Sequence, residues 1–423
     1  MSVTIVVGAQ GGDEGKGKFV DFLSSNYDLV IRYSGGDNAG HTIVNDMGIF
    51  HLHLVPSGIF NYKADNLIGT GMVVNPDSLR DEIKNLNTRG VCTEKLRVSG
   101  KAHILMPYHI AIDCANEKKH SIIDTTKRGI GPAYADRAYR DGLRFEDLLD
   151  VQGLHQKLSR ALSRVNAILA YYGEPFFDLE LLESKCIEWR SIYKDIIVEP
   201  ISFIHDYLKA GRSILFEGQL GILRDLDLGT YPYVTSSYPS AAYACVSAGI
   251  SVHEVNSIIG IARAYPIFAG NGPFPTEMDA ETAQCLRGTG EKIDDEYGVT
   301  TNRPRRIGWM DLPLLKYSSL INGYTEIALS KLDKFDQFES IKVCVAYQLN
   351  GKEIDYIPTT RELDQVKPVY ITLQGWKSNT SNVRRVNDFP RKALEYIKVI
   401  ENSIHIPVKY IGVGPARHEI AIL

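Results

Sequence analysis

A glycine-rich segment near the N-terminus carries the residues whose types and spacing most directly indicate chemistry. It reads Gly-Gly-Asp-Glu-Gly-Lys-Gly-Lys from Gly11 to Lys18, and it follows a β-branched run from Val3 to Val7. Glycines let backbone N–H groups approach phosphate oxygens, and a helix beginning at Lys16 would add the partial positive charge of its N-terminus. The segment therefore predicts a P-loop-like site for the phosphates of a nucleotide.

This segment differs from a Walker A loop at the residue that would bind magnesium. The Gly-x-x-x-x-Gly-Lys spacing is met from Gly12 onward, but Phe19 stands where a Ser or Thr should coordinate the metal. Asp13 and Glu14 would repel phosphate unless one of these carboxylates holds Mg²⁺ or acts as a base. The pattern therefore predicts a catalytic phosphate loop and argues against a standard P-loop NTPase.

Two further polar residues are candidates for chemistry at the same site. His41 lies in the run Asn-Ala-Gly-His-Thr, and an imidazole held in such a loop can donate to a developing oxyanion near neutral pH. Asp333 follows the apolar stretch from Glu326 to Leu329, which places it at the carboxyl edge of a sheet, where ligands usually bind. Because a carboxylate can accept from guanine N1–H and the 2-amino group, Asp333 favours GTP over ATP.

Basic residues cluster in one short segment that contains Arg303, Arg305 and Arg306. Bidentate guanidinium contacts suit a dicarboxylate such as aspartate, and for Arg306 a solvated basic surface is the alternative. The net charge of −4 gives no bulk attraction to a polyanion. We therefore expect small-molecule substrates and no nucleic-acid partner.

These residues must be positioned by alternating strands and helices. Strand patterns cover Val3–Val7, Leu29–Tyr33, Ser213–Phe216, Ser257–Ala262, Glu326–Leu329, Lys342–Ala346 and Val408–Ile411. Helical patterns cover Lys16–Leu23, Asp77–Asn87, Leu154–Tyr172, Ile201–Lys209 and Arg391–Asn402. The alternation predicts an α/β fold with a mainly parallel central sheet flanked by helices. We expect a single domain over residues 1–423 with a helical insertion around 145–193.

Composition limits the class of protein. The chain has 423 residues, of which 44% are hydrophobic, enough to bury a large core. Its six cysteines form no Cys-x-x-Cys pair. No basic leader precedes the first strand pattern, and no stretch approaches about 18 uninterrupted apolar residues. We therefore expect a cytoplasmic protein with no membrane partner.

Several separated motifs resemble those of the adenylosuccinate synthetase family. In chain order they are Gln10 with Gly12–Lys18, Arg32-Tyr33 with Gly35-Gly36 and Asn38–Thr42, Arg128–Tyr134, Gly229–Ser237, Gly272–Glu277 and Lys331–Asp333. The resemblance implies a purine-biosynthetic ligase in which GTP phosphorylates the 6-oxo group of inosinate. GDP leaves in that step, and the amino group of aspartate then displaces phosphate from C6, which gives adenylosuccinate.

The resemblance also implies roles for individual residues. The catalytic residues would be Asp13, which removes the N1 proton and contacts Mg²⁺, His41 and Lys16, with the Gly40 carbonyl as the second metal ligand. The GTP site would comprise Gly12, Glu14, Gly15, Gly17, Lys18, Gly40, Thr42, Arg305, Lys331, Asp333, Gly412 and Gly414. The acceptor nucleotide would be bound by Asn38, Thr126, Leu220, Thr235, Arg303 and, from the second subunit of a homodimer, Arg140. Aspartate would be bound by Val299, Thr300, Thr301, Arg303 and Arg305.

The run from Phe216 to Gly221 departs from the family pattern next to the purine. Where bacterial relatives have Glu-Gly-Ala-Gln-Gly, this chain has Glu-Gly-Gln-Leu-Gly, so Leu220 replaces the glutamine that faces the base. A polar base edge left unpaired would cost roughly 1–3 kcal/mol, enough to alter substrate choice. Together with Gly11 in place of the family's Trp, this leaves two alternatives open. One is a paralogue acting on a guanylate-type nucleotide or an antibiotic precursor, and the other is a non-catalytic GTP-binding protein.

Overall fold

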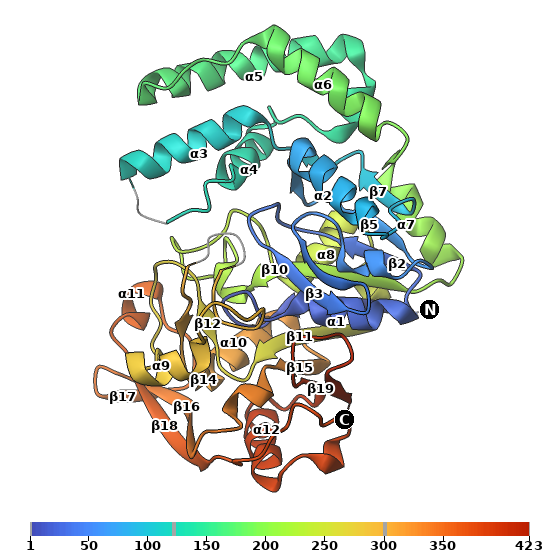
Figure 1. Cartoon of the computed structure of the whole chain (residues 1–423). Coiled ribbons are helices and arrows are strands. Elements are labelled where there is room, and N and C mark those ends of the chain that lie inside the picture. Colours follow the sequence, from blue (N-terminus) through green and yellow to red (C-terminus); the bar gives the residue numbers. More distant parts are fainter. Residues whose placement is uncertain (1, 121–123, 299–302, 423) are drawn as a thin grey trace.

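The computed structural model describes residues 2–120, 124–298 and 303–422, and its main feature is a long twisted sheet (Figure 1). In this described part the sheet has the strand order β20-β19-β15-β11-β1-β10-β2-β5-β7-β9. Neighbouring strands are parallel except for β20, which pairs antiparallel with β19. The strands are β1 (Val3–Gly8), β2 (Leu29–Arg32), β5 (Asp65–Ile68), β7 (Leu96–Ser99), β9 (Ile197–Val198), β10 (Ile214–Gly221), β11 (Ser257–Arg263), β15 (Glu326–Ser330), β19 (Val408–Gly412) and β20 (Ile420–Ile422). The predicted α/β class with a mainly parallel sheet is confirmed.

One predicted strand belongs to a different sheet. The pattern at Lys342–Ala346 lies within β16 (Ser340–Leu349), which pairs antiparallel with β17 (Lys352–Ile354) and β18 (Lys367–Gln374) and parallel with β14 (Met310–Asp311). Buried and exposed residues largely alternate along β16, as expected for a strand with one face toward solvent. Its assignment to the mainly parallel sheet was therefore wrong.

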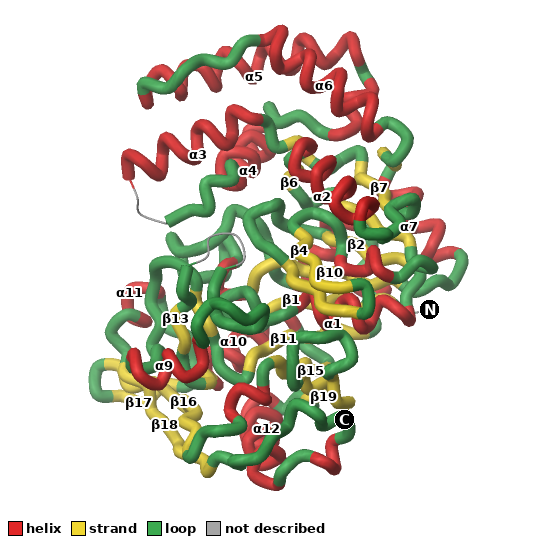
Figure 2. The backbone as a smooth tube through the Cα atoms, in the orientation of Figure 1, coloured by secondary structure: helices red, strands yellow, loops and turns green. Residues whose placement is uncertain are grey.

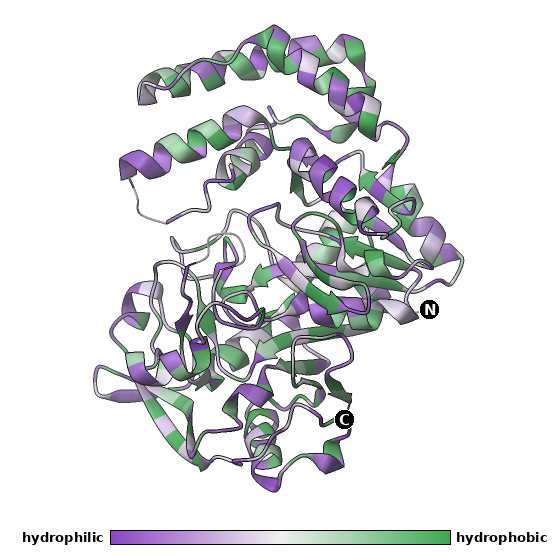
Figure 3. Cartoon of the chain, viewed as in Figure 1, coloured by the Kyte–Doolittle hydropathy of each residue, from purple (hydrophilic) through white to green (hydrophobic). Residues whose placement is uncertain are grey.

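Helices lie against the central sheet (Figure 2), and their buried apolar side chains join those of the strands in the core. They include α1 (Lys16–Leu23), α2 (Pro76–Thr88), α7 (Pro200–Lys209), α8 (Ala241–Ala248), α10 (Leu312–Asn322) and α12 (Arg391–Ile404). The start of α2 is fixed locally, because Asn75 accepts from the N–H groups of Asp77 and Ser78 and Pro76 needs no donor at the first helical position. Figure 3 shows central strands that are largely hydrophobic and helices that carry both hydrophilic and hydrophobic residues.

A group of helices lies at one end of the molecule, opposite the second sheet (Figure 1). It contains α3 (Pro107–His120), α4 (Ile130–Tyr139), α5 (Val151–Tyr172) and α6 (Leu179–Tyr193). Helix α6 is attached to α2, since Trp189 Nε1 donates to Asp77 Oδ1 at 2.9 Å and Tyr193 Oη donates to the Pro76 carbonyl. Helices α5 and α6 occupy the region where the sequence predicts a helical insertion.

The remaining α-helices and β-strands of the described chain are short. They are the hairpin of β3 (His41–Asn45) and β4 (Gly48–Leu52), the pair β6 (Val73–Val74) and β8 (His103–Ile104), the pair β12 (Ile267–Phe268) and β13 (Arg306–Ile307), and the helices α9 (Ala280–Arg287) and α11 (Thr360–Leu363). None of the helices in the described ranges is both long and apolar enough to cross a bilayer.

Candidate nucleotide site at the ends of the parallel strands

The phosphate loop connects β1 to α1 and is organised by its own glutamate. Glu14 is fully buried, and its Oε1 accepts from the N–H groups of Gln10 at 3.1 Å and Gly12 at 2.8 Å. Its Oε2 accepts from Lys16 Nζ at 2.6 Å. A Cβ at Gly8 would lie 2.4 Å from the same oxygen, so this position requires glycine. Glu14 therefore satisfies backbone donors inside the loop, which explains how an anion-binding loop tolerates it.

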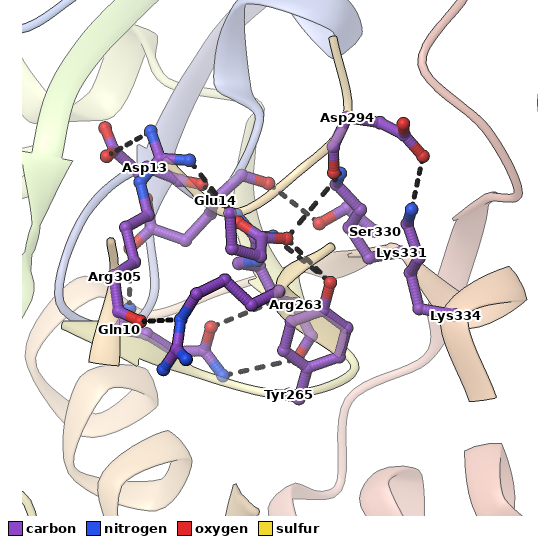
Figure 4. Close-up of polar contacts among 12 residues, drawn as sticks. Gln10, Asp13, Glu14, Arg263, Tyr265, Asp294, Arg305, Ser330, Lys331 and Lys334 are labelled. Atoms are coloured by element: carbon purple, nitrogen blue, oxygen red, sulfur yellow. Dashed lines mark hydrogen bonds and ion pairs between the residues drawn. The ribbon is translucent and has the colours of Figure 1, made fainter. Parts of the chain in front are cut away.

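Asp13 is the loop carboxylate that faces the site. Its backbone φ is 57°, its side chain is 29% exposed, and its Oδ2 lies 2.8 Å from Arg305 Nη2 (Figure 4). Arg263 Nη1 donates to the Asp13 carbonyl at 2.7 Å. Burial alone would raise the pKa of Asp13, but Arg305, Lys16 and Arg263 outweigh it and hold the pKa below its ordinary value. Asp13 is therefore ionised at neutral pH.

His41 is oriented by a residue to which the sequence assigned no role. Glu217, in the middle of β10, is fully buried, and its Oε1 lies 2.5 Å from His41 Nδ1. Ser57 also donates to Glu217, from its N–H at 2.7 Å and its hydroxyl at 2.5 Å. Burial and Arg32 lower the pKa of His41, against the effect of Glu217. The carboxylate binds Nδ1 and leaves Nε2 as the ring nitrogen available to a ligand.

A second buried ion cluster borders the site (Figure 4). Glu296 pairs with Arg263, accepts from Tyr265 Oη at 2.7 Å and lies 3.6 Å from Lys331 Nζ. Burial would raise the pKa of Glu296, but Arg263, Lys331 and Arg305 lower it to about 2. The sequence predicted Lys331 as a site residue but missed Arg263, Tyr265 and Glu296. Arg263 ends β11 and could have been found by the strand-edge argument used for Asp333, whereas nothing local marks Glu296.

Two cavities meet at the phosphate loop. The larger has a volume of about 950 Å³ and the smaller about 130 Å³. Residues that line both are Asp13, Ala39, Gly40, Leu220 and Arg305. The loop carboxylate therefore stands between a space large enough for a nucleotide and a narrower space around the helix N-terminus.

Most residues predicted for the site line these cavities. The larger one is lined by Gly12, Asn38, Thr126, Thr235 and Arg303 in addition to the shared residues. The smaller one is lined by Glu14, Gly15, Lys16, Gly17, Lys18, His41, Thr42, Lys331 and Gly414. The side chain of Arg303 pairs with Asp124.

Other predicted residues lie elsewhere. Asp333 and Gly412 are not among the residues that line the two cavities. Asp333 Oδ1 is buried and has no hydrogen-bond partner among the described residues. Gly412 packs beside Lys18. Arg140 is exposed at the end of α4. Predicted residues Val299, Thr300 and Thr301 lie outside the described residues.

Lys18, which the resemblance assigns to the GTP site, has its ammonium group bonded to two backbone carbonyls. Its Nζ donates to the carbonyls of Gly414 at 2.6 Å and Glu419 at 2.8 Å, and burial lowers its pKa to about 7. In this structure Lys18 thus attaches α1 to the C-terminal segment. Of the two loop lysines, Lys16 is the one whose charge is balanced by a carboxylate of the loop itself.

The residues present fit a magnesium ion that is coordinated mainly by the phosphates of a bound nucleotide. Within the described ranges no group of three or more His, Cys, Asp or Glu side chains could hold a metal. Asp13 and the Gly40 backbone lie together on both cavity walls. Mg²⁺ commonly takes one or two protein oxygens and completes its shell with substrate phosphates and water.

The strand-edge location, the phosphate loop and the joined cavities define a nucleotide-using α/β enzyme. The sequence profile of the adenylosuccinate synthetase family matches residues 5–421. The chain is 49% identical to "Adenylosuccinate synthetase 1" of Methanosarcina acetivorans, with 100% of each chain covered. It is 43% identical to the adenylosuccinate synthetase of Carboxydothermus hydrogenoformans over 100% of this chain and 99% of that one. The chain belongs to the adenylosuccinate synthetase family.

Solved structures agree with this assignment. The fully ligated adenylosuccinate synthetase of Plasmodium falciparum superposes with a TM-score of 0.93 at 35% identity, and 100% of each chain is covered. The succinoaminodeoxyadenylate synthetase of cyanophage S-2L, bound to dGMP and dATP, gives a TM-score of 0.63 at 20% identity over 100% of this chain and 95% of that chain. The second likeness shows the shared fold alone.

Proposed function

We propose that this chain joins aspartate to C6 of inosine monophosphate in a GTP-dependent, GDP-forming reaction of purine biosynthesis that passes through a 6-phosphoryl intermediate. Family membership across residues 5–421 supports this activity. The position of Asp13 on the walls of both cavities carries the mechanism. An acceptor nucleotide in the larger cavity and the γ-phosphate of GTP in the smaller one would meet at this carboxylate.

The proposed chemistry begins with activation of the purine oxygen. Asp13 is ionised and takes the N1 proton, so that the 6-oxygen can attack the γ-phosphate. His41 presents Nε2 to the smaller cavity, and the negative phosphates favour its protonated form, which then donates to the phosphoryl oxygens. Lys16 supplies a positive charge at the helix N-terminus. Mg²⁺, held by Asp13 and the Gly40 carbonyl, would neutralise phosphate charge when bound.

The base of GTP is proposed to bind beside Asp333. Its buried Oδ1 lacks a partner among the described residues, and burial raises the pKa of the carboxyl. A buried acceptor without a donor is costly, and guanine N1–H and its 2-amino group supply donors that adenine lacks. Lys331, Gly412 and Gly414 would complete this end of the GTP site, and Gly12, Glu14, Gly15, Gly17, Lys18, Thr42 and Arg305 would surround the phosphates.

The acceptor and aspartate sites are proposed in the larger cavity. Asn38, Thr126 and Thr235 would bind the monophosphate, and Arg303 and Arg305 would bind the carboxylates of aspartate together with the segment Val299–Thr301. Arg140, exposed at the end of α4, would reach the acceptor of the partner subunit in a homodimer. We also propose a single cytoplasmic domain with an insertion around 145–193 and no nucleic-acid or membrane partner. Light scattering combined with gel filtration tests the dimer.

A guanylate-type acceptor is the second candidate function, and Leu220 is the observation that favours it. The residue has φ of 60° and lines both cavities, so an apolar side chain faces the reacting region. Gln219 does not compensate, because it is 1% exposed and its amide is bonded to Arg32 and Asn38.

Initial-rate assays with GTP, aspartate and either inosinate, guanylate or deoxyguanylate separate the two candidates. We expect phosphate release and an aspartate adduct with inosinate. Failure with inosinate together with turnover of guanylate or deoxyguanylate would replace the first candidate with the second. Absence of phosphate release with all three acceptors would support the non-catalytic alternative. Unchanged phosphate release by an Asp13→Ala variant in the complete mixture would contradict the mechanism.

A further inference from the structure

A buried chain of amide and guanidinium groups runs from the central sheet to the larger cavity through Gln219. We propose that Gln219 is a positioning residue that fixes the polarity of the Asn38 amide, so that Asn38 presents its N–H₂ group to the monophosphate of the acceptor nucleotide. This inference rests on the proposed function, which places the acceptor phosphate at Asn38. Gln219 lies in the run Glu-Gly-Gln-Leu-Gly, directly before Leu220 on the cavity wall.

This series of hydrogen bonds starts at the guanidinium group of Arg32, which can only donate. Arg32 ends β2 and is fully buried, and its Nη2 lies 3.1 Å from Gln219 Oε1. A guanidinium has no acceptor atom. The Gln219 amide must therefore turn its oxygen toward Arg32, since the opposite orientation would place N–H₂ against N–H.

The orientation of the Gln219 amide in turn fixes the orientation of the Asn38 amide at the cavity wall. With Oε1 turned toward Arg32, Gln219 Nε2 points to Asn38 and donates to its Oδ1 at 2.7 Å. Gln219 is 1% exposed, so water does not compete for these groups. Asn38 is only half-buried and lines the larger cavity. With Oδ1 engaged by Gln219, its Nδ2 is the group left to face a ligand.

Gly35 makes room for this arrangement. Its φ is 89°, and a Cβ at this position would lie 2.2 Å from Gln219 Oε1. The glutamine therefore occupies a space that any other residue at position 35 would fill. The confinement keeps the Gln219 amide between Arg32 and Asn38.

The functional consequence is a fixed donor for an anion. A free asparagine amide presents either its oxygen or its nitrogen, and the oxygen would repel a phosphate. Holding the donor toward the cavity before binding avoids that reorganisation, which improves affinity without a contact between Gln219 and the substrate. Gln219 should therefore affect the KM for the acceptor nucleotide and leave the KM values for GTP and aspartate unchanged.

Gln219→Glu reverses the polarity and provides the main test. The new carboxylate would accept from Arg32 with one oxygen and from Asn38 Nδ2 with the other, so that Asn38 turns its oxygen to the cavity. We expect the KM for the acceptor nucleotide to rise at least about tenfold, the size of one lost hydrogen bond to a charged group, with a much smaller change in kcat. Gln219→Met removes both bonds without adding charge and should raise the same KM roughly threefold to tenfold.

The added charge is controlled by repeating Gln219→Glu in an Asn38→Ala background. There only direct repulsion of the phosphate remains, so the rise in KM should be clearly smaller than in the wild-type background. Equal effects in the two backgrounds, or an unchanged acceptor KM in Gln219→Met, would overturn the inference. Circular dichroism checks folding, and Gln219→Met carries the test if the charged variant does not fold.

Turnover assays of the wild-type enzyme distinguish a failure of the proposed function from a failure of the role proposed for Gln219. If it turns over none of the three acceptors, the proposed function fails whatever Gln219 does. If it turns over one of them and the variants behave as wild type, only the role of Gln219 fails.

Discussion

Replacing Glu217 by glutamine removes the charge that orients His41 while changing the side chain very little in shape. The carboxylate accepts from His41 Nδ1, from the Ser57 N–H and from the Ser57 hydroxyl. An amide has one accepting oxygen and one donating nitrogen. If its oxygen faces His41, its N–H₂ meets the Ser57 N–H; if it is reversed, its N–H₂ faces Nδ1. Either orientation loses at least one bond to a charged group.

The size of the effect follows from that loss. A buried hydrogen bond to a charged group contributes about 1.5–3 kcal/mol. Since about 1.36 kcal/mol corresponds to a factor of ten in rate, kcat should fall between roughly 10-fold and 150-fold if His41 acts in the transition state. The pH profile should also move. Glu217 raises the pKa of His41, so its removal lowers that pKa further. The alkaline limb of kcat, where a protonated His41 is lost, should shift to lower pH.

The assay is initial-rate measurement of GTP-dependent phosphate release between pH 6 and 9 with saturating substrates. Asp311→Asn is the matched control, because Asp311 is equally buried but contacts Leu314 and Tyr347 instead of site residues. A Glu217→Gln enzyme with wild-type kcat and an unshifted profile would refute the role assigned to the His41 and Glu217 pair.

Three further predictions concern single carboxylates. Asp13→Asn should lower kcat by about 10²–10⁴, the usual contribution of a general base, and retain GTP binding in calorimetry; a smaller loss would contradict its role as base. Asp333→Asn should raise the KM for GTP by about 10-fold to 100-fold and leave the acceptor KM unchanged, and an unaltered KM for GTP would place guanine elsewhere. For Asp311, burial raises the pKa from 3.8 to about 6, so its ionisation costs the folded state stability as pH rises through this range. Relative to wild type, Asp311→Asn should gain about 2.5 kcal/mol in unfolding free energy between pH 4 and pH 7, since most of the shift of about two units, at about 1.36 kcal/mol per unit, falls in this window. Denaturant titrations at the two pH values measure this gain, and a pH-independent difference would contradict it.

Patterns that depend on neighbouring residues were predictable. The apolar run before the glycines predicted β1, and helix α1 covers the predicted residues Lys16–Leu23. Helix α2 follows from Asn75 and Pro76, whose capping effects are local. The strand Lys342–Ala346 shows the limit of this reasoning, because a β pattern does not specify which strand will pair with it.

By itself the sequence determined the α/β alternation, the loop from Gly11 to Lys18 and a set of motifs distributed over the whole chain. Only the tertiary structure decided how the charges are paired. In the folded chain the Glu14 carboxylate bonds to the backbone of its own loop. The Glu217 carboxylate bonds to His41, which is 176 positions away in the sequence. The physical reason is that helix and strand propensities act over a few residues, whereas a buried charge takes whichever partner the packed strands bring within hydrogen-bond distance.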